Sequence, residues 1–147
     1  MDLGSFFNAM GIAKKEYCRS LEPVCKRFGL TQNELAVLLF LHNNPGRDRA
    51  ADIVSCRGIA KSHVSLSVSS LEAQKLLSRR SDPSDRRACH LVLTAKGMEI
   101  AEAGAARQRH FFETLYTGIA PEERAQMRVI TQKIMDNIAA FDRETTK

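Results

Sequence analysis

Apolar residues recur every three or four positions over two long stretches, one near each end of the chain. The first covers residues 5–28, and Gly29 follows it as a residue suited to ending a helix. The second runs from Pro121 to about residue 141, with Glu122 and Glu123 in its first turn, where the helix dipole favours acids. The spacing predicts two long amphipathic helices. Their apolar positions are Phe6, Met10, Ala13, Tyr17, Leu21, Val24 and Phe28 in the first and Met127, Ile130, Ile134, Ile138 and Phe141 in the second.

Shorter helices are predicted between these two stretches. Thr31 followed by Glu34 is a capping-box pattern, and it precedes the apolar run 35–41. A helix that is apolar on all sides is expected to be buried centrally. Residues 50–56 predict a short helix, with Asp48 as a possible N-cap.

Residues 60–74 predict a helix with two unlike faces. Val64, Val68 and Leu71 follow one another at i, i+4 and i+7 and form the face directed to the core. The opposite face is polar. It carries Lys61, Ser62, His63, Ser65, Ser69 and Ser70.

A β-hairpin is predicted next. Residues 77–81 and 88–93 predict two short strands around the polar turn 82–85. Alternation along the second strand directs Cys89 inward, on the same side as Leu91.

Thr94 is a natural N-cap for a long helix over residues 95–117, in which Gly97 and Gly104 allow neighbouring backbone to approach closely. The predicted fold class is therefore mainly α with a small β-hairpin. A short helix, a tight turn and a polar-faced helix followed by a basic hairpin form a winged helix-turn-helix arrangement.

Composition fits one soluble globular domain and places the excess charge in its centre. The 147 residues include 22 Lys and Arg, 17 Asp and Glu and 44% apolar residues, for a net charge of +5. Residues 57–96 hold eight basic and three acidic residues, so this segment accounts for the whole net charge. A concentrated basic face attracts polyanions, although a basic surface that is merely solvated would give the same count.

Several short motifs follow one another at characteristic distances between residues 30 and 97. They are Ala60-Lys-Ser-His-Val-Ser65, Leu71-Glu72, Arg79 with Arg80, Asp82-Pro-Ser-Asp-Arg-Arg87 and Leu93-Thr-Ala-Lys-Gly97. On these motifs the chain resembles the MarR family of winged helix-turn-helix transcriptional regulators. The resemblance implies one MarR-like domain over residues 1–147, with 30–97 as its DNA-binding part.

The resemblance also implies a homodimer in which residues 5–28 and 98–142 form the dimerisation helices. The apolar stripes agree, because they are too long to be covered by one small winged domain. The two winged domains of such a dimer face adjacent major grooves, so the expected partner is double-stranded DNA with a palindromic operator, and repression is the common mode in the family.

Two groups of residues are candidates for DNA contact. Hydroxyl and imidazole groups at the start of a helix in the major groove can meet base edges and phosphates. Arginines of the wing can reach phosphates or a narrow minor groove, and the resemblance suggests that Asp85 holds one of them in place. The candidate DNA-binding residues are Lys61, Ser62, His63, Ser65, Arg79, Arg80, Asp85, Arg86 and Arg87.

Lys75 departs from the family pattern, which has Gly at this position after Leu71-Glu72. Glycine suits a left-handed helix cap, where a residue with a side chain costs about 1 kcal/mol. Either the turn differs in this chain or Lys75 accepts that cost.

Three kinds of signal could regulate DNA binding, because members of the family respond to small aromatic compounds, to oxidants or to metal. Release by a small aromatic ligand is the preferred hypothesis, with Phe28, Phe40 and Phe111 as possible lining. The alternative is thiol oxidation at Cys18, which lies near the position of the reactive cysteine in the peroxide-sensing branch. Cys18 and Cys25 are seven residues apart on one helix, too far for a bond within one chain.

Other classes find little support in the sequence. It contains no Gly-rich phosphate loop, no Gly-x-Ser-x-Gly elbow and no paired-carboxylate signature, so neither an enzyme nor a cofactor is predicted. The four histidines form no metal-binding pair. The longest apolar run, 35–41, is too short to span a membrane, and the absence of a secretory signal favours the cytoplasm. A winged helix that contacts only proteins is a further alternative, against which the basic hairpin argues.

Overall fold

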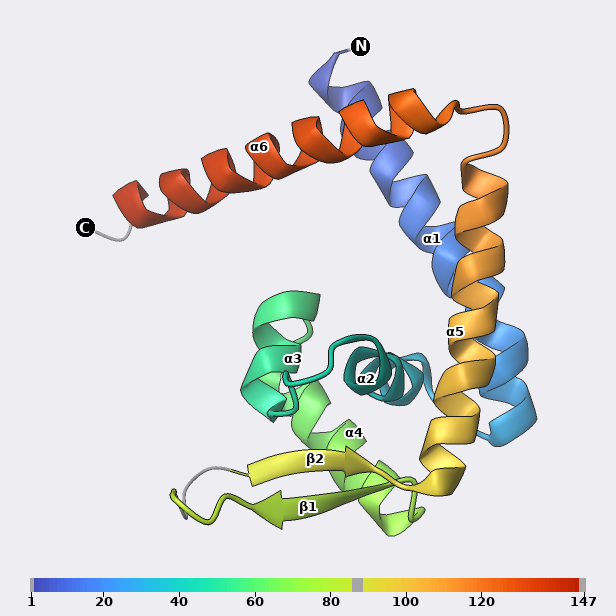
Figure 1. The fold of residues 1–147 in the computed structure, drawn as a ribbon, viewed down its shortest axis with the longest axis vertical. Coiled ribbons are helices and arrows are strands. Elements are labelled where there is room, and N and C mark those ends of the chain that lie inside the picture. The colour runs from blue at the N-terminus through green and yellow to red at the C-terminus, as the bar shows by residue number, and fades with distance from the viewer. Residues whose placement is uncertain (1, 86–88, 146–147) are drawn as a thin grey trace. The chain divides into compact units, whose positions relative to one another are not determined.

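Two compact units make up the structure, a computed structural model that describes residues 2–85 and 89–145 (Figure 1). The first unit is Met1–Phe111 and the second is Phe112–Lys147. In chain order the elements are α1 (Leu3–Phe28), α2 (Gln32–Asn43), α3 (Ala50–Arg57), α4 (Lys61–Ala73), β1 (Leu77–Ser81), β2 (Cys89–Leu93), α5 (Ala95–Leu115) and α6 (Pro121–Thr145). The predicted mainly α fold with a small hairpin is confirmed.

Helix α2 supplies the largest share of the core of the first unit. Leu35, Leu38 and Leu39 are fully buried, as the apolar run 35–41 predicts. Gly104 lets α5 pack closely, since a Cβ there would lie 3.0 Å from the Leu39 side chain. The other elements add Leu21, Val24 and Cys25 from α1, Ile53 from α3, Val64, Val68 and Leu71 from α4, Leu77 and Leu91 from the hairpin, and Ile100, Ala101 and Ala105 from α5.

The starts of α2 and α3 are capped differently. Thr31 Oγ1 accepts a hydrogen bond from the Glu34 N–H at 3.2 Å, and Glu34 Oε2 accepts one from the Thr31 N–H at 2.7 Å, which confirms the capping box. The predicted cap of α3 is wrong. Arg49 is the N-cap, and its N–H donates to Asp52 Oδ2 at 3.1 Å. The Asp48 carboxylate is bound instead by a side chain of β2.

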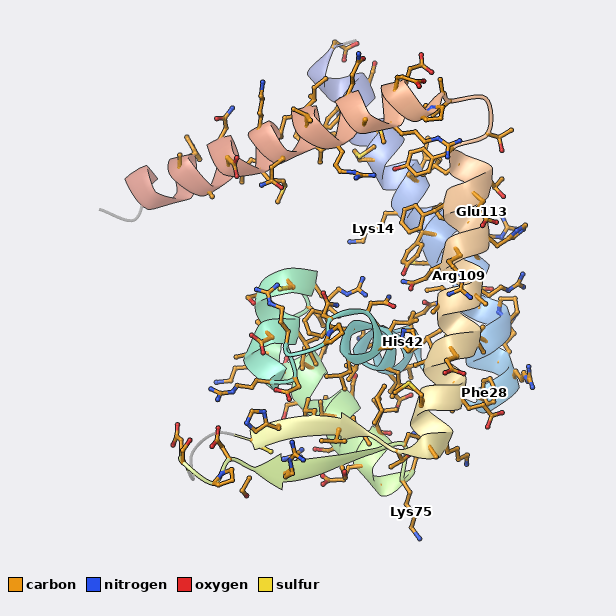
Figure 2. All side chains as sticks on the ribbon, viewed as in Figure 1. Lys14, Phe28, His42, Lys75, Arg109 and Glu113 are labelled. Carbon is orange, nitrogen blue, oxygen red and sulfur yellow. The ribbon has the colours of Figure 1, made fainter. Side chains whose placement is uncertain are left out.

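The turn from α4 into β1 keeps the left-handed cap. The Leu76 N–H donates to the Leu71 carbonyl and the Lys75 N–H to the Glu72 carbonyl, each at 2.9 Å, which is the bond pair of a Schellman motif. Lys75 has a φ of 58°, so it adopts the conformation for which the family uses glycine. Figure 2 shows its side chain extending away from the protein. The turn therefore has the left-handed form, and Lys75 adopts it despite the conformational cost to a residue with a side chain.

A close contact between Leu76 and Gly97 joins this turn to α5. A Cβ on Gly97 would overlap the Leu76 carbonyl oxygen and lie 2.9 Å from its carbonyl carbon. The same oxygen accepts a hydrogen bond from the Thr94 N–H at 3.1 Å. Thr94 Oγ1 in turn accepts one from the Gly97 N–H at 3.1 Å, so Thr94 caps α5 as predicted. The Leu-Thr-x-x-Gly pattern thus sets where α5 leaves the hairpin.

Strands β1 and β2 are antiparallel, with Leu77 opposite Leu93. Leu77 and Leu91 are buried, whereas Cys89 lies on the same face as Leu91 but is exposed. The alternation is as predicted, because Cys89 and Leu91 line the same cavity. Cys89 is exposed because its side chain borders this cavity and not packed core. Ala88, the first residue of the predicted strand, lies outside the described residues.

The apolar stripes of the long helices are covered only in part. In α1, Leu21 and Val24 are buried in the core, whereas Phe6 and Met10 near its start are exposed. In the second unit the stripe of α6 is exposed at Met127, Ile130, Ile134, Ile138 and Phe141. These helices are amphipathic, and no helix in the described part of the chain is long and apolar enough to cross a membrane.

Candidate nucleic-acid interface

The outward face of α4 presents short polar side chains to solvent. The four predicted contact residues on this helix are all exposed, and the core-facing residues on its other side are buried as predicted. Leu66 is also exposed on the outward face, although the sequence pattern did not single it out. The predicted contacts are Lys61, Ser62, His63 and Ser65.

Arg79 ties the first strand of the hairpin to α4. Its Nε lies 3.1 Å from Glu72 Oε2, and its Nη2 donates a hydrogen bond to Ser69 Oγ at 3.2 Å. Both side chains of the ion pair are 43% exposed, so solvent screens the attraction. Arg79 therefore holds the hairpin beside the polar face of α4 while its charge stays at the surface.

Arg80 lies on the opposite face of the hairpin from Arg79. Successive residues of a strand point to opposite faces, and the cross-strand partner of Arg80 is His90, whereas that of Arg79 is Leu91. Arg80 is exposed. The two arginines therefore place positive charge on both faces of the hairpin.

His90 contacts two carboxylates, Asp82 in the hairpin turn and Asp48 just before α3, and the second contact links the hairpin to α3. Its Nδ1 lies 2.7 Å from Asp48 Oδ1, and its Nε2 lies 3.1 Å from Asp82 Oδ2. Arg49 Nη2 lies 3.6 Å from the same Asp82 oxygen. The Leu91 N–H also donates to the Asp48 carbonyl at 2.7 Å. These contacts hold the wing in a defined orientation against the helix-turn-helix.

The electrostatics of this cluster favour its charged form. The hydrogen bond to Asp48, followed by that to Asp82, raises the pKa of His90. Hydrogen bonds from the Ser84 side chain and N–H, together with His90, hold the pKa of Asp82 far below its usual value. No local pattern could have found this cluster, because His90 is 42 residues from Asp48.

Three predicted contacts remain, and the structure describes one of them. Asp85 is exposed, and Arg86 and Arg87 lie outside the described residues. The expectation that Asp85 orients one of these arginines stays a prediction. Asp82, in the hairpin turn, accepts hydrogen bonds from the Ser84 N–H at 2.8 Å and the Ser84 hydroxyl at 2.6 Å.

A cavity of about 400 Å³ lies among α3, α4 and the hairpin. Its lining is mostly apolar and includes Val54, Val64 and Leu91, together with the charged side chains of Lys61 and Arg79. Three of the predicted DNA contacts, Lys61, Ser65 and Arg79, therefore line a cavity rather than packed core.

The aromatic candidates for ligand binding lie in different surroundings. Phe40 is fully buried in the core. Phe28 is half-buried beneath the Arg27 guanidinium and lines a hollow of about 290 Å³ formed by α1 and α5. The Phe111 ring meets the Tyr17 ring edge to face, with 5.5 Å between centroids. Phe28 thus lines a hollow at the surface of the first unit.

Cys18, the sensor candidate, is half-buried in α1, and its thiol is free. Its backbone carbonyl accepts a hydrogen bond from Gln32 Nε2 at 2.9 Å. Cys25 is buried, and burial raises the pKa of its thiol, which disfavours the reactive thiolate. Cys25 is therefore poorly suited to redox chemistry.

The helices α3 and α4 followed by the hairpin define a winged helix-turn-helix protein, a class that binds DNA. The family model described as MarR family matches residues 28–88, which contain α2, α3, α4 and β1. Over this segment the chain is similar to the MarR family, and it shares the winged helix-turn-helix fold of a solved MarR-family regulator from Silicibacter pomeroyi.

Known proteins resemble the chain over most of its length. The transcriptional repressor MprA of Escherichia coli K12 is 23% identical over 120 residues, which are 81% of this chain and 68% of MprA. The S. aureus MepR–DNA complex has a TM-score of 0.73 at 22% identity, covering 93% of this chain and 98% of MepR. CouR from Rhodococcus jostii RHA1, bound to p-coumaroyl-CoA, has a TM-score of 0.73 at 25% identity, covering 90% and 91%.

Proposed function

We propose that this protein is a homodimeric repressor that binds a palindromic operator and is released by a small-molecule ligand. The observation that carries the proposal is the exposed polar face of α4, held beside the hairpin by Arg79 and Glu72. A helix that offers hydroxyl and imidazole groups fits the major groove of DNA. The name of MprA, a transcriptional repressor, supports repression as the mode of regulation.

Each predicted contact residue has a role in this proposal. Ser62, His63 and Ser65 meet base edges or phosphates in the major groove, while Lys61 neutralises a phosphate. The basic residues of the hairpin contact phosphates or enter the minor groove, and Asp85 orients one of them. The hairpin residues are Arg79, Arg80, Arg86 and Arg87.

Dimer formation is supported by the apolar side chains that each unit leaves exposed. Exposed apolar surface at helical spacing marks an interaction site. Ile130, Ile134 and Ile138 follow one another along α6 and are all exposed, as are Phe6 and Met10 at the start of α1. A second copy of the chain would remove these stripes from water and pair two winged units for a palindromic site.

Release by a small aromatic ligand is supported by the ligand in the CouR structure and by the hollow beside Phe28. That hollow is also lined by Arg27 and Arg107, so it combines an aromatic ring with two guanidinium groups. An aromatic acid suits such a lining, since its ring can stack and its carboxylate can pair with arginine. Phe40 on α2 and Phe111 on α5 remain the other aromatic candidates.

Salt-dependent DNA titration tests the proposal. A labelled duplex recovered by selection from a random DNA pool is titrated with the full chain at several salt concentrations, and binding is followed by fluorescence anisotropy. For six to eight phosphates per dimer, the slope of log K against log salt should be about −5 to −7. Lys61→Ala should make the slope less steep by about 2, one unit for each subunit. Lys14→Ala on α1 is the matched control and should leave the slope unchanged, whereas a wild-type slope near zero contradicts the proposal.

A further inference from the structure

Leu66 stands in the middle of the outward face of α4. It is 69% exposed, the largest value for any large apolar side chain in the part of the chain that the structure describes. One helical turn before it is Ser62, and one turn after it are Ser69 and Ser70. Leu66 is therefore a long apolar side chain among short hydroxyl groups.

Folding of the first unit does not account for this leucine. The core contacts of α4 come from Val64, Val68 and Leu71, which lie on the other side of the helix. Beside Leu66 is a hollow of about 380 Å³ between α4 and the start of α2, also lined by His63. Most of the other exposed large apolar side chains in the described part of the chain lie on α1, α5 and α6, the helices of the proposed dimer interface. Nothing in that dimer covers the face of α4 that enters DNA.

The chemistry of the major groove supplies a partner for such a side chain. Thymine is the base that carries a methyl group there, and apolar side chains recognise it by contact. A serine hydroxyl both donates and accepts hydrogen bonds, so it discriminates weakly between base edges. Leucine can do neither and can read only the methyl group. The shape and position of Leu66 therefore suit a thymine and exclude a polar base edge.

We infer that Leu66 is a specificity-determining residue that contacts the C5-methyl group of a thymine in each operator half-site. This inference rests on the proposed function, because it requires α4 to lie in the major groove. It makes Leu66 the source of a preference for thymine at one position, with the neighbouring serines supplying hydrogen bonds that tolerate several bases.

Replacing thymine by deoxyuridine tests this contact, since it removes only the methyl group. In the duplex recovered by selection, each thymine pair related by the operator symmetry is replaced in turn, and Kd is measured by anisotropy. Removal of one buried methyl group corresponds to about a fourfold loss of affinity per half-site. The wild type should show this loss at one thymine position. Leu66→Ala should bind thymine and deoxyuridine duplexes equally at that position, while Leu66→Met and the matched control Ser65→Ala should keep the difference.

Two results would overturn the inference. The wild type could bind every deoxyuridine duplex as tightly as the thymine duplex, or Leu66→Ala could keep the full loss at the sensitive position. Circular dichroism checks that Leu66→Ala is folded, and its exposed position predicts an unchanged Tm. Failure of the wild type to bind any selected duplex is a separate outcome, because it would overturn the proposed function before Leu66 is tested.

Discussion

The Nε atom of Arg79 lies 3.1 Å from Oε2 of Glu72, so the first strand of the hairpin is joined directly to the helix that carries the polar face. An exposed pair of this kind contributes on the order of 0 to 1 kcal/mol to folding. Its main effect is positional, because it aligns the hairpin with α4 while keeping the guanidinium at the surface.

Arg79→Ala should weaken DNA binding and make the salt slope less steep by about 2 per dimer, because one phosphate contact is lost in each subunit. Glu72→Gln should have the opposite effect on affinity, since it removes an acidic group from the DNA-facing surface and releases Arg79. Both variants are measured by anisotropy with the selected duplex. A weaker Arg79→Ala variant with an unchanged slope would mean that Arg79 acts only by positioning the hairpin.

Lys75→Gly should stabilise the protein. Lys75 has a φ of 58°, and a left-handed conformation costs a residue with a side chain about 1 kcal/mol more than glycine. The free energy of unfolding in urea should therefore rise by about 1 kcal/mol, measured at one protein concentration because dimerisation also affects it. Lys75→Ala is the control and should change stability little, since alanine meets the same strain. Equal stability of the glycine and alanine variants would refute this explanation of the turn.

Gly97→Ala should destabilise the protein by about 2 to 3 kcal/mol, because its Cβ would overlap the Leu76 carbonyl oxygen and force the backbone to move. Gly11→Ala in α1 is the matched control. A Cβ at that position meets no atom within 4 Å, so the change should stabilise the helix by roughly 0.5 to 1 kcal/mol. Urea unfolding of the two variants checks the contrast, and an unaffected Gly97→Ala would show that this contact is not tight.

The contribution of His90 to stability should depend on pH. Its pKa is raised in the folded protein, so its contribution is complete below about pH 6.5 and is lost as the pH rises through the raised pKa. Asp82 has a lowered pKa, so its contribution is present above about pH 4 and is lost as the pH falls through that lowered pKa.

Both contributions are therefore complete between about pH 4 and pH 6.5. The Tm difference between wild type and His90→Gln should be largest in this window and should shrink at higher pH. Asp48→Asn, which removes the other partner of His90, should reproduce part of the loss. A Tm difference that stays constant from pH 5 to about pH 9 would show that the ion pairs of His90 contribute nothing.

Local sequence predicted what depends on neighbouring residues, as at Thr31 with Glu34 and at Thr94 with Gly97. Predictions from the local sequence were wrong where the contacts of a side chain come from residues far away in the chain. Asp48 resembles a helix cap in its local sequence, but His90 binds its carboxylate across 42 positions. Cys89 follows the predicted alternation, yet it is exposed because it borders a cavity.

In the candidate site, too, local sequence predicts some features, whereas others depend on the fold. Helical spacing predicts the polar face of α4, and the structure exposes its residues except Ser70, which is half-buried. Helical spacing does not single out Leu66, because the exposure of a leucine depends on what packs against it. The pairing of Arg79 with Glu72 required the hairpin to be placed against α4, which only the fold provides.

Selection of bound duplexes from a random DNA pool is the most direct test of DNA recognition by two symmetric winged units. The full chain is used, and the enriched sequences are aligned. The proposed homodimer should enrich an inverted repeat whose half-site centres lie about 10 base pairs apart. Enrichment of a single unrepeated half-site would contradict the dimer, and a pool without enrichment would contradict sequence-specific DNA binding itself.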